Sequence, residues 1–236
     1  MRNIIAIVGK EMRGYLGAPS FYIIISIFLF ISGYGFGWSP ATFLESSIQG
    51  FLEWSQFFIL FLGPALTVRL FSEEEKLGTL ELLLTAPLRD IEIVLGKYMA
   101  ALGTYSLMLV LTFFYPLLLL GFGHPDLGPI ISGYLGLFLL GAVFLSIGLF
   151  ASSLTANQIV AFVMSSALIL FFWFIGLTEG WTGDQTFRLF QLISLSTYFP
   201  AFGRGIIDTN GVIYYLSLVL VFLFLTLRSL ESRRWR

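Results

Sequence analysis

Six long apolar runs, separated by short polar segments, dominate the chain. They cover residues 20–38, 51–70, 98–121, 129–152, 158–177 and 211–227. Each run holds about 20 residues, which is the length that an α-helix needs to cross the roughly 30 Å hydrocarbon core of a bilayer. The runs are too continuous for the alternating strands of a membrane barrel, and lipid offers no partners to an open backbone. The pattern therefore predicts an all-α polytopic membrane protein with six transmembrane helices.

Composition and charge agree with this prediction. Hydrophobic residues make up 57% of the 236 residues and charged residues only 11%, whereas soluble domains are about 25% charged. The net charge of −1 excludes a generally basic nucleic-acid binder, so we expect no nucleic-acid partner. The chain has no cysteine and a single histidine, His124, and its carboxylates lack metal-ligand spacing. We therefore predict no metal site and no cofactor in this chain.

The basic residues predict the orientation. If both termini are cytoplasmic, 11 of the 13 Lys and Arg residues lie inside, and only Arg188 and Arg204 lie outside. Cytoplasmic loops of membrane proteins carry such an excess of positive charge. We therefore expect a multi-pass protein with membrane lipids around its spans and both termini in the cytoplasm.

The N-terminal segment, residues 1–19, has an amphipathic pattern. Lys10 and Arg13 lie opposite an apolar stripe, and Pro19 marks a break before the first span. The stripe consists of Ile4, Ile5, Val8, Met12 and Leu16. We favour a helix that lies in the inner membrane interface with its cations toward the head groups. A simple positive flank that sets the topology is the alternative.

The loop at residues 72–97 carries the most information outside the spans. Ser72 with Glu75 three residues later is a capping-box pattern, which would place Glu73 to Glu75 in the first turn of a short helix. Pro87 would end that helix, and Asp90 would cap the next one, which runs into the third span. The short helix would carry an apolar stripe of Leu77, Leu80, Leu83 and Leu84. This stripe needs a cover, either from the same chain or from a partner protein.

The segment at residues 178–210 is too apolar for a free loop and too broken for another span. We interpret it as two short helices that dip into or lie on the outer leaflet, split near residues 196–200. Small residues in two spans predict close helix packing, either within the chain or between two copies. They are Gly33 and Gly37 in the first span, and Gly96, Ala100 and Thr104 leading into the third.

The spans contain no charged residue away from their edges, which argues against an ion-coupled transporter. Neither Gly9-Lys10 nor Gly96-Lys97 stands in a phosphate-binding loop, because no Ser or Thr follows and no glycine precedes at the required spacing. We therefore predict that this chain is not an enzyme and has no catalytic residue. Any ATP-driven role needs a separate ATPase, for which the capped helix in the 72–97 loop is the natural docking place.

These parts together resemble the ABC-2 type permeases, and several stretches are similar to the gliding-motility-associated GldF-like permeases. The stretches are FSEEEKLGTLELLLT at 71–85, IVLGKY at 93–98, GLFASSLTANQIVA at 148–161, RGIID at 204–208 and LRSLESRRW at 227–235. The first of them is shared with copper-enzyme maturation permeases, so it does not define the substrate.

The resemblance implies a single ABC-2 type transmembrane domain over residues 1–236. Its parts are the interfacial helix at 1–19, spans at 20–71, the coupling loop at 72–97, spans at 98–177, the outer re-entrant segment at 178–210, the last span at 211–228 and a cytoplasmic tail at 229–236. Docking and coupling to the ATPase would rest on Ser72, Glu73, Glu74, Glu75, Gly78, Thr79 and Glu81.

The resemblance also implies partners. These are two ABC ATPase subunits that bind ATP and Mg²⁺, a second copy or a sister permease, and in GldF-like systems an auxiliary subunit, in a bacterial inner membrane. The expected function is an exporter permease. The alternative is a membrane anchor whose ATPase drives assembly of a cell-envelope, gliding or secretion complex. A secondary transporter or channel is the third possibility, and the uncharged spans argue against it.

Overall fold

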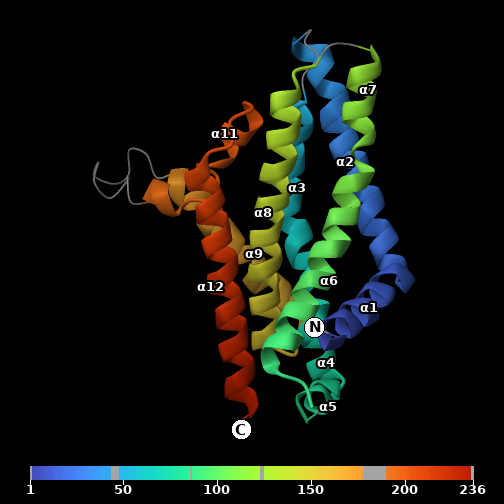
Figure 1. The fold of residues 1–236 in the computed structure, drawn as a ribbon, viewed down its shortest axis with the longest axis vertical. Helices are drawn as coiled ribbons and strands as arrows, with labels where there is room; N and C mark the ends of the chain where they lie inside the picture. Colours follow the sequence, from blue (N-terminus) through green and yellow to red (C-terminus); the bar gives the residue numbers. More distant parts are fainter. Residues whose placement is uncertain (1, 44–47, 86, 123–124, 178–189, 235–236) are drawn as a thin grey trace.

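The computed structural model describes residues 2–43, 48–85, 87–122, 125–177 and 190–234, and every element in them is helical (Figure 1). The helices are α1 (Arg2–Gly17), α2 (Pro19–Phe43), α3 (Gln49–Thr67), α4 (Arg69–Lys76), α5 (Thr79–Thr85), α6 (Asp90–Leu111), α7 (Phe114–Phe122), α8 (Leu127–Leu154), α9 (Gln158–Phe174), η1 (Ile175–Leu177), α11 (Phe199–Gly203) and α12 (Thr209–Arg234). The predicted all-α class is confirmed.

Five stretches are long and apolar enough to cross a membrane. They are Pro19–Gly37, Gln49–Lys76, Asp90–Gly121, Leu127–Leu154 and Thr209–Arg233. The fifth predicted span is α9, an apolar helix of 17 residues that the short η1 turn extends. The third span begins at Asp90 rather than at residue 98, because α6 starts directly after the loop and runs into the apolar stretch without a break.

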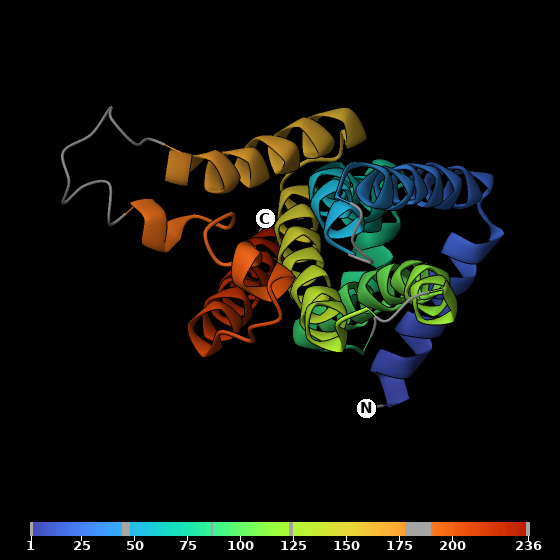
Figure 2. The same ribbon diagram turned by 90° about the horizontal axis from the view of Figure 1, so that it is seen from above.

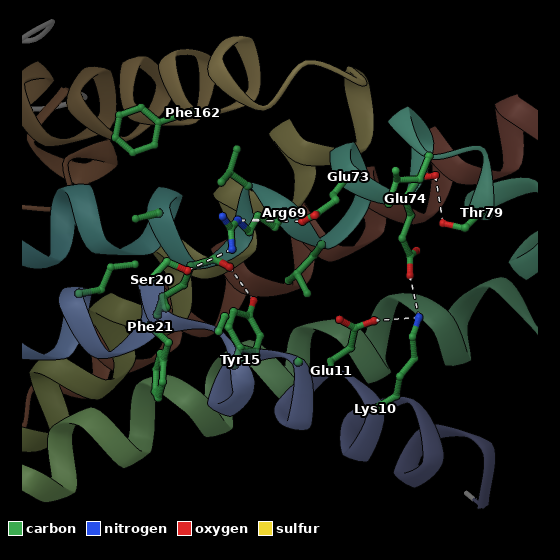
Figure 3. Close-up of a pocket in the computed structure, with 18 residues that line it drawn as sticks. Lys10, Glu11, Tyr15, Ser20, Phe21, Arg69, Glu73, Glu74, Thr79 and Phe162 are labelled. Carbon is green, nitrogen blue, oxygen red and sulfur yellow. Dashed lines mark hydrogen bonds and ion pairs between the residues drawn. The ribbon is translucent and has the colours of Figure 1, made fainter.

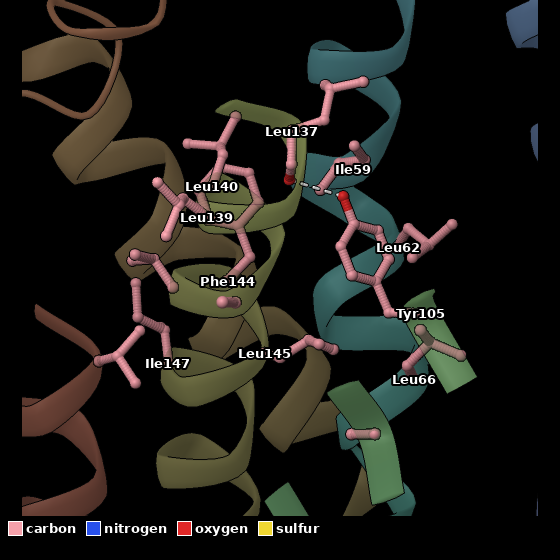
Figure 4. Close-up of a cluster of buried hydrophobic side chains, with 14 of the residues drawn as sticks. Ile59, Leu62, Leu66, Tyr105, Leu137, Leu139, Leu140, Phe144, Leu145 and Ile147 are labelled. Atoms are coloured by element: carbon pink, nitrogen blue, oxygen red, sulfur yellow. Dashed lines mark hydrogen bonds between the residues drawn. The ribbon is translucent and has the colours of Figure 1, made fainter. Parts of the chain in front are cut away.

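Helix α8 forms the centre of the bundle and contacts α3, α6, α9, α11 and α12 (Figure 2). Of its most apolar stretch, 83% is buried within the protein, compared with 22% for α2 at the periphery. Glycines in α8 let neighbouring helices approach it closely. A Cβ atom at Gly141 would overlap the ring of Tyr105, whose hydroxyl donates to the Leu137 carbonyl at 2.7 Å (Figure 4).

Helices α6 and α7 form one span with an interruption at Thr112 and Phe113. The cause is Pro116, which has no N–H to donate to the Thr112 carbonyl and whose ring crowds that carbonyl. The hydroxyl of Tyr134 on α8 donates to this carbonyl at 2.9 Å instead. The span therefore bends without leaving a buried backbone group unsatisfied.

One of the two small-residue patterns packs within the chain. A Cβ atom at Gly96 would lie 2.7 Å from Ile7 of α1, so this glycine brings α1 close to α6. In α2, a Cβ at Gly33 would lie 3.0 Å from the Tyr115 hydroxyl, whereas a Cβ at Gly37 would meet no atom within 4 Å. Internal packing therefore explains Gly96 and Gly33 but not Gly37.

The described part of the predicted outer segment folds back onto the bundle. Residues 190–193 are helical, a turn follows, and α11 packs on α8, where Ser132 donates to the Phe202 carbonyl at 2.6 Å. In the turn, Ser194 and Ser196 both donate to the Trp173 carbonyl near the end of α9. The described part therefore consists of two short helical pieces separated at residues 194–198, while residues 178–189 lie outside the described residues.

The C-terminal end of α12 lies at the same end of the bundle as α4 and α5 (Figure 1). Helix α1 lies close to this end too and packs along α6. Helix α9 is strongly inclined to α8 (Figure 2), and Phe172 in its last turn packs edge-on against Phe222 of α12. This arrangement gathers the polar residues of α1, α4, α5 and α12 at one end of the protein.

Candidate functional site

The candidate site begins where α3 passes into α4. Val68 keeps helical dihedral angles of −54° and −33°, so α4 continues almost directly from α3. The Ser152 hydroxyl of α8 accepts the backbone N–H groups of Phe71 and Ser72 at 3.0 and 3.1 Å and donates to the Val68 carbonyl at 2.9 Å. A serine from a distant part of the chain therefore satisfies the buried groups at this junction.

The prediction that Ser72 caps a new helix is wrong. Ser72 lies within α4 and is fully buried, and its own hydroxyl donates to the Val68 carbonyl. Glu73 to Glu75 consequently lie in the last turn of α4 and not in a first turn. The helix dipole disfavours carboxylates there, so they need nearby cations.

The predicted single helix between Ser72 and Pro87 is in fact two helices. Gly78 adopts a φ of +71°, and its N–H donates to the Glu75 carbonyl at 3.1 Å, which ends α4. Thr79 is the first residue of α5, and its hydroxyl donates to the Glu74 carbonyl at 3.2 Å across the turn. Asp90 is the first residue within α6 and not its cap. The Glu92 carboxylate instead accepts the Arg89 N–H at 3.2 Å.

The most buried charge among the described residues is Lys97 of α6, whose side chain is 1% exposed. Its Nζ atom lies 2.9 Å from the Glu11 carboxylate of α1, 2.9 Å from the Glu74 carboxylate of α4 and 2.7 Å from the Leu70 carbonyl. Lys10 adds a second cation, 3.0 Å from Glu74 (Figure 3). We call Lys10, Glu11, Glu74 and Lys97 the charge cluster. It ties α1, α4 and α6 together.

Lys10 shows how the cluster balances burial against charge. Burial lowers its pKa, but the hydrogen bond and charge of Glu74, together with Glu11, more than offset this effect, so that the pKa of Lys10 is raised. Lys10 therefore stays charged at physiological pH. One turn further along α1, the Tyr15 hydroxyl donates to the Leu66 carbonyl at 2.5 Å, and burial raises the pKa of that hydroxyl.

The face of α1 that packs on the protein differs from the predicted apolar stripe. It carries Ile7 together with Asn3 and Glu11, which bind Glu92 and Lys97 of α6. Ile5 and Leu16 of the predicted stripe are exposed. The helix therefore packs on α6 through a face of polar and apolar residues and leaves Ile5 and Leu16 exposed.

A second ion pair holds the other side of α4. Arg233, near the end of α12, pairs with Glu75, and Arg69 lies 4.0 Å from Glu73. Each of the three glutamates thus has a basic partner. A hollow of about 520 Å³ lies next to the Arg233 pair. Its lining is Glu75, Gly78, Leu80, Glu81, Leu154, Ser229, Ser232 and Arg233.

Helix α5 presents a mixed surface beyond the end of the bundle. Leu80 faces inward and is buried, whereas Leu77 and Leu82 are 67% and 71% exposed. Thr79 and Glu81 are exposed beside them. Of the three predicted stripe leucines with described side chains, Leu80 is fully covered, Leu83 is half-buried and Leu77 is exposed; the side chain of Leu84 lies outside the described residues.

The predicted residues thus have different surroundings. Gly78, Thr79 and Glu81 are exposed, Glu73 to Glu75 contact cations of the same chain, and Ser72 is buried. Sequence reasoning missed Lys97, Ser152 and Arg233. A lysine within an otherwise apolar stretch was the available signal for Lys97. No group of three His, Asp or Glu residues in the described part of the chain could hold a metal ion.

The comparisons with known proteins place these features in a family. A search among curated proteins found no significant match. The model of the ABC-2 family transporter proteins matches residues 39–191, which is more than half of the chain. The matched segment runs from the end of α2 beyond α9 and includes α4, α5 and Lys97. The chain therefore belongs to the ABC-2 family of transporter proteins, as a membrane permease component.

Proposed function

We propose that the chain is the permease subunit of an ATP-driven exporter and that a separate ATPase docks on α5 and the turn before it. The observation that carries the proposal is the uncovered surface of Leu77, Leu82 and Glu81 at the end of the bundle. Exposed leucines outside the membrane spans need a cover, and ABC-2 permeases generally work with an ABC ATPase. This end, with both termini near it, faces the cytoplasm of a bacterium in our proposal.

The docked ATPase acts on the bundle through α4. A displacement of α5 is transmitted to α1 and α6 through Glu74 and Lys97, and to α12 through Glu75 and Arg233. Ser152 links the same helix to the central α8. Two permeases, either identical or sister chains, work with two ATPase subunits that bind ATP and Mg²⁺. ATP-driven movement of the two α5 helices then opens a path for the cargo.

The predicted docking residues fall into two groups, one that contacts the ATPase and one that holds α4 to the bundle. Gly78, Thr79 and Glu81 contact the ATPase, because they are exposed. Glu74 and Glu75 hold α4 to the bundle, because each already has a cation within the chain. Reversing their charge would change folding as well as docking, so Glu81 is the better test position.

The stretch at 71–85 and the tail at 227–235 support a closer kinship with GldF-like permeases. In that case an auxiliary permease-like subunit also takes part, and gliding motility is one process that the complex serves. The contribution of the tail is visible in this chain, since Arg233 pairs with Glu75.

The test is purification from native membranes in mild detergent, with identification of stoichiometric partners and an ATPase assay. We expect Glu81→Lys and Leu82→Asp each to reduce recovery of the ATPase at least about tenfold while thermal stability is unchanged, since a buried interface pair contributes about 2–5 kcal/mol. Glu53→Lys, at the opposite end of α3, is the matched control. Full ATPase recovery with both α5 variants would refute docking on α5. Stimulated ATPase activity without solute transport in vesicles would favour the membrane-anchor alternative.

A further inference from the structure

A large cavity lies between α1, the start of α2 and the α3–α4 junction. Its volume is about 710 Å³ (Figure 3). One part is polar, with Lys10, Glu73 and Arg69, and the other is apolar, with Phe21, Ile24, Ala65, Leu66 and Phe162. The charge cluster forms one wall, because Lys10, Glu11 and Glu74 also line the cavity. An occupant must therefore combine a charged end with an apolar end.

The position of Arg69 after the apolar stretch of α3 is the one at which we expect a phospholipid phosphate. The twelve residues at 57–68 contain no charged side chain. Arg69 is therefore the first cation after the apolar stretch of α3. A helix that leaves the hydrocarbon core places its first arginine among the head groups. Its guanidinium can bind a phosphate with two parallel N–H donors.

A stripe on α3 leads from Arg69 into the apolar region. Phe57, Phe61, Ala65 and Arg69 follow one another at intervals of four residues, which places them on one helix face. Phe57 and Phe61 are 52% and 50% exposed, and the small Ala65 leaves the cavity open between them and Arg69. An acyl chain can therefore run from the cavity along Phe61 and Phe57.

The charges at the cavity favour a head group that carries both signs. Glu11 and Glu74 are already engaged by Lys97 and Lys10, at 2.9 and 3.0 Å. Arg69 and Glu73 are paired only loosely, at 4.0 Å, and both side chains are about half exposed. Arg69 also donates to the Ser20 hydroxyl at 3.1 Å, which leaves further guanidinium N–H donors for a ligand. A phosphate would bind Arg69, and an amine would bind Glu73.

We propose that this cavity is a binding site for one membrane phospholipid whose head group contains a phosphate and a primary amine, as in phosphatidylethanolamine. The phosphate contacts Arg69, the ammonium group contacts Glu73, and one acyl chain lies over Ala65 and Phe61. The bound lipid fills the angle between α1 and α2 and supports α1 beside the charge cluster. The proposal does not depend on docking of an ATPase, since it concerns the permease alone.

The test is native mass spectrometry of the delipidated protein titrated with single phospholipids. Phosphatidylethanolamine should bind about tenfold more tightly than phosphatidylcholine or phosphatidylglycerol, which is about 1.4 kcal/mol. The reason is that the choline head group has no N–H donor for Glu73 and the glycerol head group has no cation. Glu73→Gln should remove this preference, and Arg69→Ala should weaken binding of all three lipids about tenfold.

Two further variants separate binding in the cavity from a general effect of removing a positive charge. Ala65→Leu keeps every charge but narrows the cavity, and it should weaken lipid binding about as much as Arg69→Ala. Arg13→Ala removes an exposed arginine of α1 that does not line the cavity, and it should leave binding unchanged. Equal affinities for the three lipids in the unaltered protein, or equal losses in Arg69→Ala and Arg13→Ala, would overturn the proposal.

A second copy of the chain is the competing occupant of this surface. The chain contains no cysteine, so Ala65→Cys introduces a single reactive thiol. If a second copy covers the cavity through a two-fold contact that brings the two positions 65 within about 7 Å, this variant will form a disulfide-linked dimer upon oxidation, and no phospholipid will be retained. That result would also overturn the proposal. The expected result is a monomeric band on oxidation together with retained phosphatidylethanolamine.

Discussion

Replacing Lys97 by methionine tests the charge cluster most directly. Methionine keeps an unbranched side chain of similar length but removes the buried cation that lies 2.9 Å from both Glu11 and Glu74, and leaves Lys10 as their remaining cation. The side chains of these two glutamates are 16% and 13% exposed. Two poorly solvated carboxylates would then face each other across the space that the Lys97 ammonium group occupied.

The expected cost follows from this geometry. Removing one partner of a buried ion pair destabilises a protein by about 3–5 kcal/mol, because the remaining charge stays buried without its partner. Lys10 still pairs with Glu74 at 3.0 Å, and both carboxylates keep some contact with water. We therefore expect the lower end, about 3 kcal/mol, which lowers Tm by roughly 6–12 °C in a protein of this size.

Thermal unfolding in one detergent, followed by tryptophan fluorescence, measures this change. Lys76→Met is the matched control, since Lys76 is an exposed lysine of α4, and its Tm should stay within about 1–2 °C of the unaltered protein. The double variant with Lys97→Met and Glu11→Gln should be more stable than Lys97→Met alone, because Lys10 then faces only one charged carboxylate of the pair that lost Lys97. A Tm loss for Lys97→Met no larger than that of Lys76→Met would refute the reasoning, as would a double variant less stable than the single one.

Three further substitutions test other parts of the structure by the same unfolding measurement. Gly141→Ala should destabilise the protein by about 1–3 kcal/mol, because its Cβ would overlap the Tyr105 ring, whereas Gly37→Ala, which meets no atom, should be neutral or stabilising. Ser152→Ala should cost about 1–3 kcal/mol, because it leaves the N–H groups of Phe71 and Ser72 without their acceptor, while the neighbouring Ser153→Ala removes only a bond within α8 and should cost less. Gly78→Ala should cost about 1–2 kcal/mol from its φ of +71° alone, since no atom lies within 4 Å, and Gly78→Asn should recover part of this loss. Equal Tm values within any of these pairs would contradict the corresponding contact.

The apolar runs predicted the class and most of the helices, because the bilayer thickness imposes a length and a composition on every span. Helices α2, α8 and α12 cover the runs expected for them, the run at 51–70 is shared by α3 and the start of α4, and α9 falls on its run but is shorter. The break predicted at Pro19 is also found, because Pro19 begins α2. The cap of α9 was not predicted, although it is local: the Asn157 side chain accepts the Ile159 N–H.

Local patterns were misleading wherever a distant residue supplies the missing partner. Ser72 and Glu75 fit a capping box, yet Ser152 of α8 satisfies the N–H groups at the start of α4, so that the chain needs no new cap at Ser72. A spacing rule describes only the neighbours of a residue along the chain. It carries no information about a hydroxyl group 80 residues away that accepts the same backbone N–H group.

The sequence by itself thus determined that this protein is a helical membrane protein with a polar loop after its second span, because hydrophobicity and periodicity are properties of single segments. Only the tertiary structure decided that Lys97 is buried between Glu11 and Glu74, that Arg233 reaches Glu75, and that Arg69 borders an amphipathic cavity. The partners in these contacts lie far apart in the chain. The folded bundle brings these residues of α1, α4, α6 and α12 within ion-pair distance of one another. Their charges interact only in the folded chain.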